Sequence, residues 1–177
     1  MQWNVDPTHT SIEFGVKHLG IATVKGRFKK FSATVEASES GQVRSIEATI
    51  DAASIDTGVD QRDDHLRSAD FFDVARNPEI RFVSTGVRPN GAGEVVITGN
   101  LTLHGITRPV TFTLEQGTAL KDPWGNQRIA ASASGKLNRK DWGLTWNQAL
   151  ELGGVMVGEE VKFTMDVQVV AAQAVAA

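Results

Sequence analysis

The sequence predicts an all-β protein: one antiparallel barrel of about eight strands, with a short helix in one crossover connection. Three observations lead to this fold class. Apolar and polar residues alternate with a period of two along most of the chain, turn-forming residues separate the alternating stretches, and a charged stretch at 51–73 interrupts them. We expect one domain over residues 1–170, followed by an alanine-rich tail at 171–177.

Alternation begins near the amino terminus. One strand places His18 on the same face as three apolar residues, namely Ile12, Phe14 and Val16. The next stretch changes phase at Lys29–Lys30, and such a slip predicts a bulge. Its apolar face consists of Val24, Gly26, Phe28, Phe31, Ala33 and Val35.

The later strands follow in order. They are predicted at 46–51, 80–85, 95–103, 110–114, 129–137 and 161–169, with turns at GQVRS, RPNGAGE, KDPWGN and VGEE. His104 to Thr107 separate two of these strands, which predicts a hairpin with Gly105 in its turn. Pro109, near the start of the second strand, is tolerated at an edge or a bulge.

Closure into a barrel leaves no exposed strand edge, so we favour a barrel over a sandwich. The strand at 95–103 also spans roughly 30 Å at about 3.3 Å per residue, which suits a tilted barrel wall. The predicted inner face includes small residues, namely Gly26, Ala48, Gly99, Ala131, Ala133 and Gly135. These residues favour a hollow lumen, and the alternative is that they fit the taper of a filled barrel.

A short helix is predicted to start at a Thr57 cap, with Asp60 three residues later, and to run to about Ser68. Asp63 and Arg67 are spaced for a surface ion pair. The two phenylalanines that follow, at 71–72, would anchor this segment on the barrel.

This charged segment has two interpretations. It can be the solvated face of a crossover connection, or it can be a lid. In the second case Arg62, His65 and Arg67 would meet the polar end of a ligand at the mouth, because guanidinium donors suit phosphate oxygens. His18, on the apolar face of its strand, is either a hydrogen-bonded core histidine or a polar contact in the lumen.

Composition argues against several classes. The net charge of -3, with scattered Lys and Arg, gives no basic face for nucleic acid. There is no cysteine, and no apolar run is long enough to span a bilayer. No signal peptide is visible, so we expect a cytoplasmic location.

Chemical motifs are weak. The four histidines are isolated in sequence, so we expect no metal site and no cofactor. A nucleophile elbow, a P-loop and a dinucleotide fingerprint are all missing, and enzyme function is not expected.

Seven ordered blocks give the chain a specific resemblance. They are DPTHTSIEFGVKHLG, VKGRFKKF, ASIDTGVDQRDDHLRSADFFD, PEIRFVST, GNLTLHGITRPVTF, NRKDWGL and VGEEVKF. In these blocks, which span nearly the whole chain, the sequence resembles the YceI-like family. The resemblance implies an extended lipocalin-like barrel whose elongated pocket holds a polyisoprenoid chain or another long amphiphile. Many members carry an export signal, so a periplasmic location is the alternative.

The resemblance also implies which residues line the pocket. The matching positions are Ile12, Phe14, Phe28, Phe82, Leu101, Leu103, Phe112, Trp142 and Phe163, and strand alternation adds Ile50. Alternation places all of them inward except Trp142, which lies in an irregular stretch and can equally pack outside the barrel.

The sequence thus leads to one hypothesis and two rivals. The hypothesis is a noncatalytic binder that sequesters or carries an isoprenoid lipid, a polyprenyl phosphate or an isoprenoid quinone. One rival is an enzyme that processes a lipophilic substrate, with His65 or His18 as acid or base. The other is a filled barrel that serves as an interaction module, with a homodimer as one form.

Overall fold

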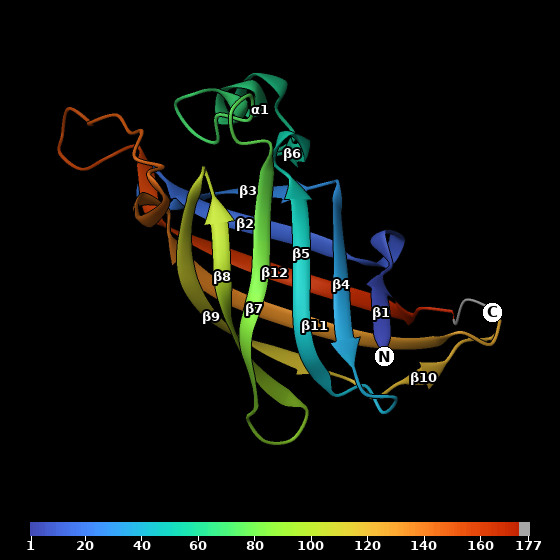
Figure 1. Ribbon diagram of the computed structural model, residues 1–177. Helices are drawn as coiled ribbons and strands as arrows, with labels where there is room; N and C mark the ends of the chain where they lie inside the picture. The colour runs from blue at the N-terminus through green and yellow to red at the C-terminus, as the bar shows by residue number, and fades with distance from the viewer. Residues whose placement is uncertain (174–177) are drawn as a thin grey trace.

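The computed structural model describes residues 1–173 as a barrel of antiparallel strands with one short α-helix (Figure 1). The strands are β1 (Gln2–Val5), β2 (Ser11–His18), β3 (Ala22–Phe28), β4 (Phe31–Ala37), β5 (Val43–Asp51), β6 (Ile55–Asp56), β7 (Glu79–Pro89), β8 (Glu94–Leu103), β9 (Ile106–Gln116), β10 (Leu120–Lys121), β11 (Gln127–Asn138) and β12 (Val157–Ala171). The helical elements are α1 (Asp60–Arg67) and three 3-10 turns, η1 (Pro7–His9), η2 (Ala52–Ser54) and η3 (Arg139–Trp142). Residues 174–177, the end of the predicted tail, lie outside the described residues.

The barrel has eight strand positions, here called walls, and two of these walls each consist of two consecutive strands. β1 and β2 form one broken wall around η1, and β3 and β4 form another around Lys29–Lys30. The bulge predicted at Lys29–Lys30 is instead a two-residue break between β3 and β4. The walls follow the order β1/β2, β3/β4, β5, β7, β8, β9, β11 and β12, and β12 pairs again with β1 and β2. The predicted eight-stranded antiparallel barrel is confirmed.

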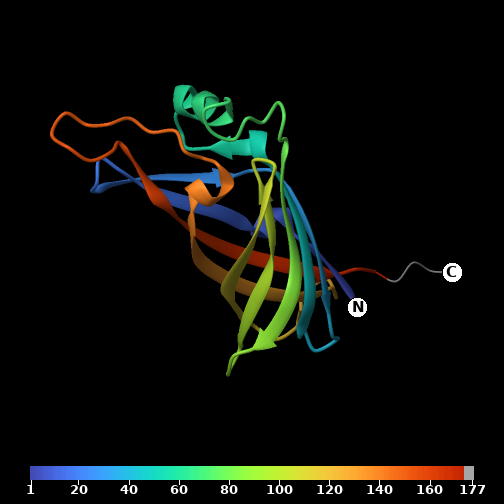
Figure 2. The ribbon, with the colours of Figure 1, turned by 60° about the vertical axis from the view of Figure 1, so that its left-hand side comes forward.

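The connections alternate between two ends of the barrel (Figures 1 and 2). One end, here the helix end, carries the connections at 19–21, 52–78, 104–105 and 139–156. The other end, here the termini end, carries the connections at 38–42, 90–93 and 117–126 together with the amino terminus and the end of β12. The two longest connections, one of which contains α1, therefore lie together at the helix end.

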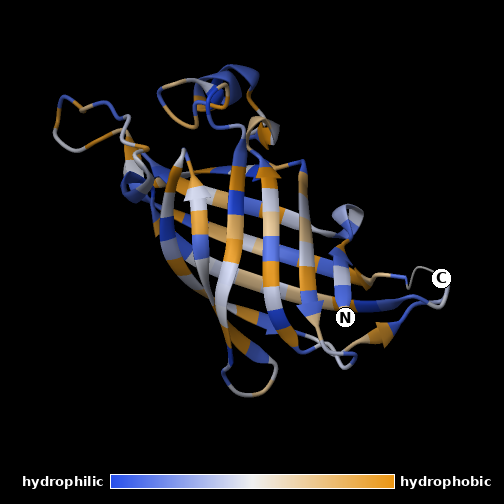
Figure 3. Ribbon diagram, viewed as in Figure 1, coloured by the Kyte–Doolittle hydropathy of each residue, from blue (hydrophilic) through white to orange (hydrophobic). Residues whose placement is uncertain are grey.

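Period-two alternation sorts the side chains between the two faces of the wall, and Figure 3 shows the resulting alternation of apolar and polar positions along the strands. On β8, Val95, Ile97 and Leu103 are buried, whereas Asn100 is exposed. A second buried cluster lies toward the termini end and contains Trp3, Val35, Ala37, Ile129 and Val169.

The hairpin between β8 and β9 is tighter than predicted. Its turn is formed by His104 and Gly105, whose φ angles of 52° and 71° allow a two-residue connection, so β9 already begins at Ile106. Pro109 therefore lies inside β9. It pairs there with Asn100 of β8, whereas β9 meets β11 farther on, through residues 113–116, so Pro109 occupies a local edge as predicted.

The predicted start of the helix is wrong. α1 is capped by Val59, and Thr57 instead donates its backbone N–H and its hydroxyl to one carboxylate oxygen of Asp63, at 2.9 and 2.6 Å. The predicted ion pair of Asp63 is wrong for the same reason, because this buried carboxylate faces Thr57 while Arg67 pairs with Asp64 at 3.0 Å. A buried carboxylate requires such donors, and the loop before α1 folds back to supply them.

Two further expectations are decided by the fold. The phenylalanines after α1 do anchor this segment, since Phe71 is buried and the ring of Phe72 meets Phe28 edge-on at a centroid distance of 5.9 Å. The turn predicted at VGEE is wrong, because β12 already begins at Val157. The reversal lies just before it, at Gly153 and Gly154, which have φ angles of 91° and 86°.

Candidate binding site in the barrel interior

Three phenylalanines lie flat against glycines of the neighbouring strand. Phe14 is paired directly with Gly26, and Phe163 with Gly135, whereas Phe82 is paired with Leu101 and lies against Gly99, two residues along β8. A Cβ atom at any of these glycines would lie 2.4 Å from the Cζ atom of the ring. The glycines therefore let the rings lie along the wall. At these three positions, the space that small residues were predicted to leave in the lumen is occupied by phenyl rings from the neighbouring strand.

The rings form two aromatic runs along the inner wall. Phe112 lies 5.6 Å from Phe82 and 6.0 Å from Phe163, measured between ring centroids. Phe14 lies 5.6 Å from Phe28 by the same measure. These distances fall in the usual range of edge-to-face aromatic contacts, so the rings support one another and keep a fixed position on the wall.

Most of the predicted wall residues are only half-buried, although they face the inside of a closed barrel. These are Ile12, Phe14, Ile50, Phe82, Leu101, Phe112 and Phe163. Deeper along the same faces, Ile97 and Leu114 are buried. Since the wall shields an inward side chain from the outside, its remaining accessible surface faces the interior. The middle of the barrel is therefore lined by apolar side chains that keep part of their surface accessible.

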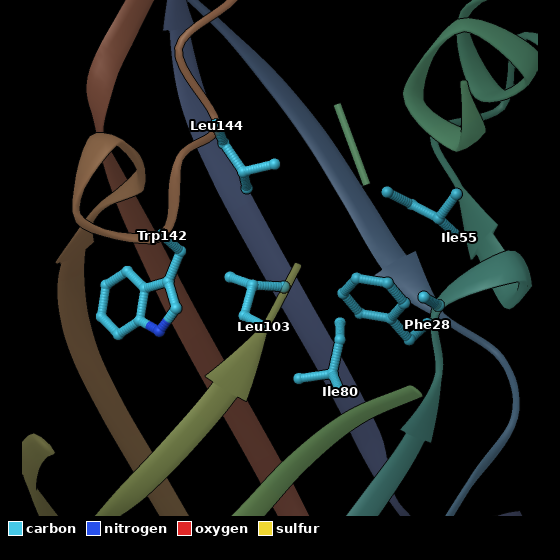
Figure 4. Packing of buried hydrophobic residues seen from close by; sticks show 7 residues of the cluster. Phe28, Ile55, Ile80, Leu103, Trp142 and Leu144 are labelled. Atoms are coloured by element: carbon cyan, nitrogen blue, oxygen red, sulfur yellow. The ribbon is translucent and has the colours of Figure 1, made fainter. Parts of the chain in front are cut away.

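The other three predicted wall residues close the helix end. Phe28, Leu103 and Trp142 are buried together with Ile55, Ile80 and Leu144, and Figure 4 shows these six side chains, from different elements, gathered in one region. The indole N–H of Trp142 donates to the Leu101 carbonyl at 3.1 Å, so this ring packs on the inner cluster. Its outward alternative is thereby ruled out.

The predicted mouth residues gather at the helix end but are partly occupied by the protein itself. Arg62 donates to the carbonyl and hydroxyl of Thr57 at 2.8 and 2.7 Å, and Arg67 donates to the carbonyls of Ala53 and Ile55 at 2.9 and 3.0 Å. These bonds fasten α1 to the loop before it and to the η2–β6 segment. That the two guanidinium groups also contact a ligand stays a prediction.

The two candidate histidines differ in position. His65 hydrogen-bonds Asp70 at 2.8 Å, and its ring lies 5.2 Å from Phe71 and 4.7 Å from Trp146. His65 therefore joins α1 to the start of the 144–156 loop. His18 is half-buried at the end of β2, opposite Ala22 of β3 and Val157 of β12.

Sequence reasoning missed Arg139, which is buried in η3. Its guanidinium donates to the carbonyls of four residues from the two ends of the 144–158 segment, namely Leu144, Trp146, Val157 and Gly158. Burial lowers the pKa of this guanidinium from its usual value. The signal in the sequence was weak, because Arg139 lies in a charged NRKD run typical of an exposed turn. Its role is to hold the long loop at the helix end.

A surface depression of about 760 Å³ lies elsewhere. It lies over β2, β3 and β12 and touches Phe14 and Gly26, but most of its lining belongs to the outer face and includes Glu13, Lys17, Lys25, Arg27, Glu160 and Lys162. These side chains are exposed and carry both signs of charge, so the depression suits an apolar chain poorly. On this chemistry, the interior is the better candidate site.

The described residues contain no group of three His, Asp or Glu side chains placed to hold a metal ion. Likewise, α1 is the one α-helix of residues 1–173, and it is neither long nor apolar enough to cross a bilayer.

Comparisons with known proteins agree with this architecture. The sequence model of the YceI-like domain matches residues 3–169. A UPF0312 protein of Staphylococcus epidermidis is 39% identical over 92% of this chain and 93% of its own, and one of Serratia proteamaculans is 42% identical over 77% and 71%.

Solved structures are similar as well. Burkholderia cenocepacia BcnA superposes with a TM-score of 0.78 at 25% identity, covering 93% of this chain and 98% of its own. A polyisoprenoid-binding domain from Saccharophagus degradans, implicated in plant cell wall breakdown, has a TM-score of 0.70 at 17% identity, with coverage of 96% and 98%. This last similarity shows the fold alone.

Proposed function

Since the chain belongs to the YceI-like domain family, we propose that it binds a long-chain isoprenoid lipid inside the barrel, for sequestration or transport, without transforming it. The observation that carries the proposal is the unfilled apolar wall. Seven inward side chains stay half-buried inside a closed barrel, and three phenyl rings are laid back onto glycines rather than packed across the centre.

The chemistry of this wall favours a long apolar chain. It offers ring faces, ring edges and aliphatic groups along several strands, with few polar atoms, so an occupant needs no hydrogen-bonding groups along its length. The methyl branches of an isoprenoid chain give many dispersion contacts with such a surface. The polyisoprenoid-binding domain of Saccharophagus degradans shares the barrel fold, which is compatible with this ligand class.

The energetics suit reversible binding. Each buried CH₂ group contributes about 0.8 kcal/mol relative to water, so a chain of several isoprene units would hardly escape into solvent. A lipid in a bilayer already has an apolar environment, and its transfer into the lumen is therefore close to neutral. Such a protein can take up and release its ligand at a membrane, and shape selects the ligand.

We place the polar head of the ligand, a phosphate or a quinone ring, at the helix end. Arg62, Arg67, His18 and His65 lie there, whereas the buried cluster around Trp3 at the termini end is apolar. Of the two guanidinium groups, Arg67 is already paired with Asp64 at 3.0 Å, so an anionic head would lie beside Arg62.

The enzyme alternative finds one supporting geometry, the hydrogen bond between His65 and Asp70. The remaining contacts of this histidine are the rings of Phe71 and Trp146, which are structural. Turnover of a candidate lipid, lost in His65→Ala while binding persists, would establish the enzyme in place of the carrier.

The test is binding, with a matched pair of wall variants. Protein isolated from its native host is extracted with organic solvent for mass spectrometry, and purified protein is titrated with a long-chain isoprenoid alcohol. Gly135→Leu displaces the Phe163 ring into the lumen, and Ser134→Leu adds the same side chain to the exposed outer face one residue away. We expect an isoprenoid in the extract, and binding that Gly135→Leu weakens by at least about tenfold, the effect of roughly 1.4 kcal/mol. An empty extract together with no binding in vitro, or equal binding by both variants, would refute the proposal.

A further inference from the structure

Exposed apolar side chains gather on two loops at the helix end. Ile21 and Leu152 are 85% and 102% exposed, and Leu19 and Val155 are 54% and 47% exposed. We call these four residues the apolar rim. Large aliphatic side chains that are exposed together in this way commonly mark an interaction surface.

The two loops lie side by side. The N–H of Leu19 donates to the carbonyl of Met156 at 2.9 Å, and His18 pairs with Val157 in the ladder between β2 and β12. The turn at 19–21 and the loop at 148–156 are therefore neighbours, and Figure 2 shows both projecting from the same side of the barrel. The four side chains of the rim thus belong to one surface.

The longer loop is a built finger. Its two arms are bridged at Ala149 and Val155, and backbone bonds join Leu150 to Gly154 at 3.1 Å and Met156 to Gln148 at 2.9 Å. At its base, the Asn147 side chain brackets Val157 with bonds of 2.7 and 3.0 Å. Arg139 ties both ends of the finger to the barrel, so Leu152 is held out at the tip.

An apolar track leads from the rim into the barrel. Behind the pair of His18 and Val157, Val16 is paired with Val161, and Phe14 is then paired with Phe163. These residues alternate inward on adjacent strands. The base of the finger also contacts the segment around α1, because Trp146 packs on His65 and Phe71.

Lys17 supplies the positive charge next to the rim. The ammonium of Lys17 lies at the base of the turn, where it donates to the Ile21 carbonyl at 3.2 Å and to the Thr23 hydroxyl at 3.1 Å. Glu159, near the base of the finger, is neutralised by Lys140 at 2.6 Å. Glu151 at the tip and Glu160 on β12 are exposed acidic residues, and they should weaken the attraction to an anionic surface.

We propose that the apolar rim inserts into the surface of an anionic bilayer and so places the helix end of the barrel against the membrane. Aliphatic side chains on projecting loops, with a cation behind them, suit shallow insertion among lipid headgroups. A second copy of the chain fits less well, since a stable interface takes roughly 20–30 residues a side and the rim offers four side chains on two tips. Docking stands on the rim itself, and the passage of lipid into the lumen rests on the function proposed above.

Flotation of the full chain with vesicles tests the docking. Phosphatidylcholine vesicles with and without phosphatidylglycerol are compared for the wild type, for Ile21→Ser with Leu152→Ser, and for a matched control, Leu120→Ser with Trp124→Ser. The control removes side chains that are 68% and 83% exposed in the connection at the termini end. Unfolding midpoints of all three proteins establish that they are folded.

We expect binding to the anionic vesicles, a loss of at least about tenfold in the rim variant, and no change in the control. Glu151→Lys should tighten binding several-fold to the anionic vesicles alone. Equal binding by rim variant and wild type, or an equal loss in the control, would overturn the proposal, and so would a rim variant that only converts a dimer to a monomer. Lipid content separates the two proposals: vesicle binding without an extractable isoprenoid refutes the carrier alone, and an extractable isoprenoid without rim-dependent binding refutes the docking alone.

Discussion

The two ends of the barrel are closed in different ways. At the termini end the wall closes itself, because Trp3, Val35, Ala37, Ile129 and Val169 come from the strands and are buried together. At the helix end, two connections lie over the opening, the one that contains α1 and the one that begins with η3. Ile55, Trp142 and Leu144 of these connections are buried against strand residues such as Phe28, and Arg67 and Arg139 donate to backbone carbonyls of the same connections. The strands of the wall separate only when the barrel unfolds, whereas a connection between strands can open by itself. We therefore infer that the mouth lies at the helix end.

The largest expected effect is a loss of stability after a substitution in the core of the termini end. Trp3→Ala removes a side chain that is 0% exposed, and we expect it to lower the free energy of unfolding by about 3–5 kcal/mol. Chemical denaturation measures this loss. Trp124→Ala, at a ring that is 83% exposed, is the matched control and should stay within about 0.5 kcal/mol of the wild type. Similar costs for the two substitutions would mean that the termini end is not a core.

A smaller and local effect is expected at the helix end. Arg139→Met keeps the length of the side chain but leaves four carbonyls without their donor, for a local cost of about 1–3 kcal/mol. Amide hydrogen exchange should accelerate within 144–157, while the amides of β7 and β8 keep their protection. Lys140→Met, at the exposed neighbour, should leave this exchange unchanged. Faster amide exchange throughout the barrel after Arg139→Met would show that the 144–157 segment and the barrel open as one unit.

The smallest effect is a dependence on acid at the termini end. Arg128 bridges Asp6 at 2.7 Å and Asp122 at 2.8 Å, fastening η1 to the connection between β10 and β11. Hydrogen bonding to Arg128 lowers the pKa of Asp122 to about 2 and lowers the pKa of Asp6 as well. Because both folded values are depressed, the stabilisation is complete above the ordinary value of 3.8 and is lost as the pH falls from there toward 2.

Thermal unfolding midpoints over this pH range check the effect. Arg128→Met should remove the part of the acid sensitivity that arises here and leave the helix end unaffected. An unchanged slope of stability against pH below 3.8 in Arg128→Met would mean that other carboxylates control acid unfolding.

The strands of the barrel were predicted well from the sequence, and the connections at the helix end were predicted poorly. Successive side chains of a strand point to opposite faces, and only one face meets the core. Alternation therefore located the strands, an irregularity at Lys29–Lys30 and the local edge at Pro109. The helix cap and the burial of Arg139 depend on partners that only the folded chain brings close. Thr57 turns to Asp63, and Arg139 finds carbonyls from both ends of a long loop.

The glycines of the wall show the same limit inside the candidate site. Composition alone suggested empty space at Gly26, Gly99 and Gly135, but the register between strands places a phenyl ring on each of them. Such pairing cannot be read without the ladder. The wall residues were therefore predicted individually, while the way in which their rings lie back from the centre was not.

The most direct test locates the ligand. An isoprenoid alcohol with a photoreactive group at the far end of its chain is bound to the protein and crosslinked, and the adducts are mapped by mass spectrometry with an unlabelled isoprenoid as competitor. We expect competed adducts on inner-wall residues such as Phe82, Phe112 and Phe163. Competed adducts on the charged outer faces of β2, β3 and β12, with none on the inner wall, would contradict it.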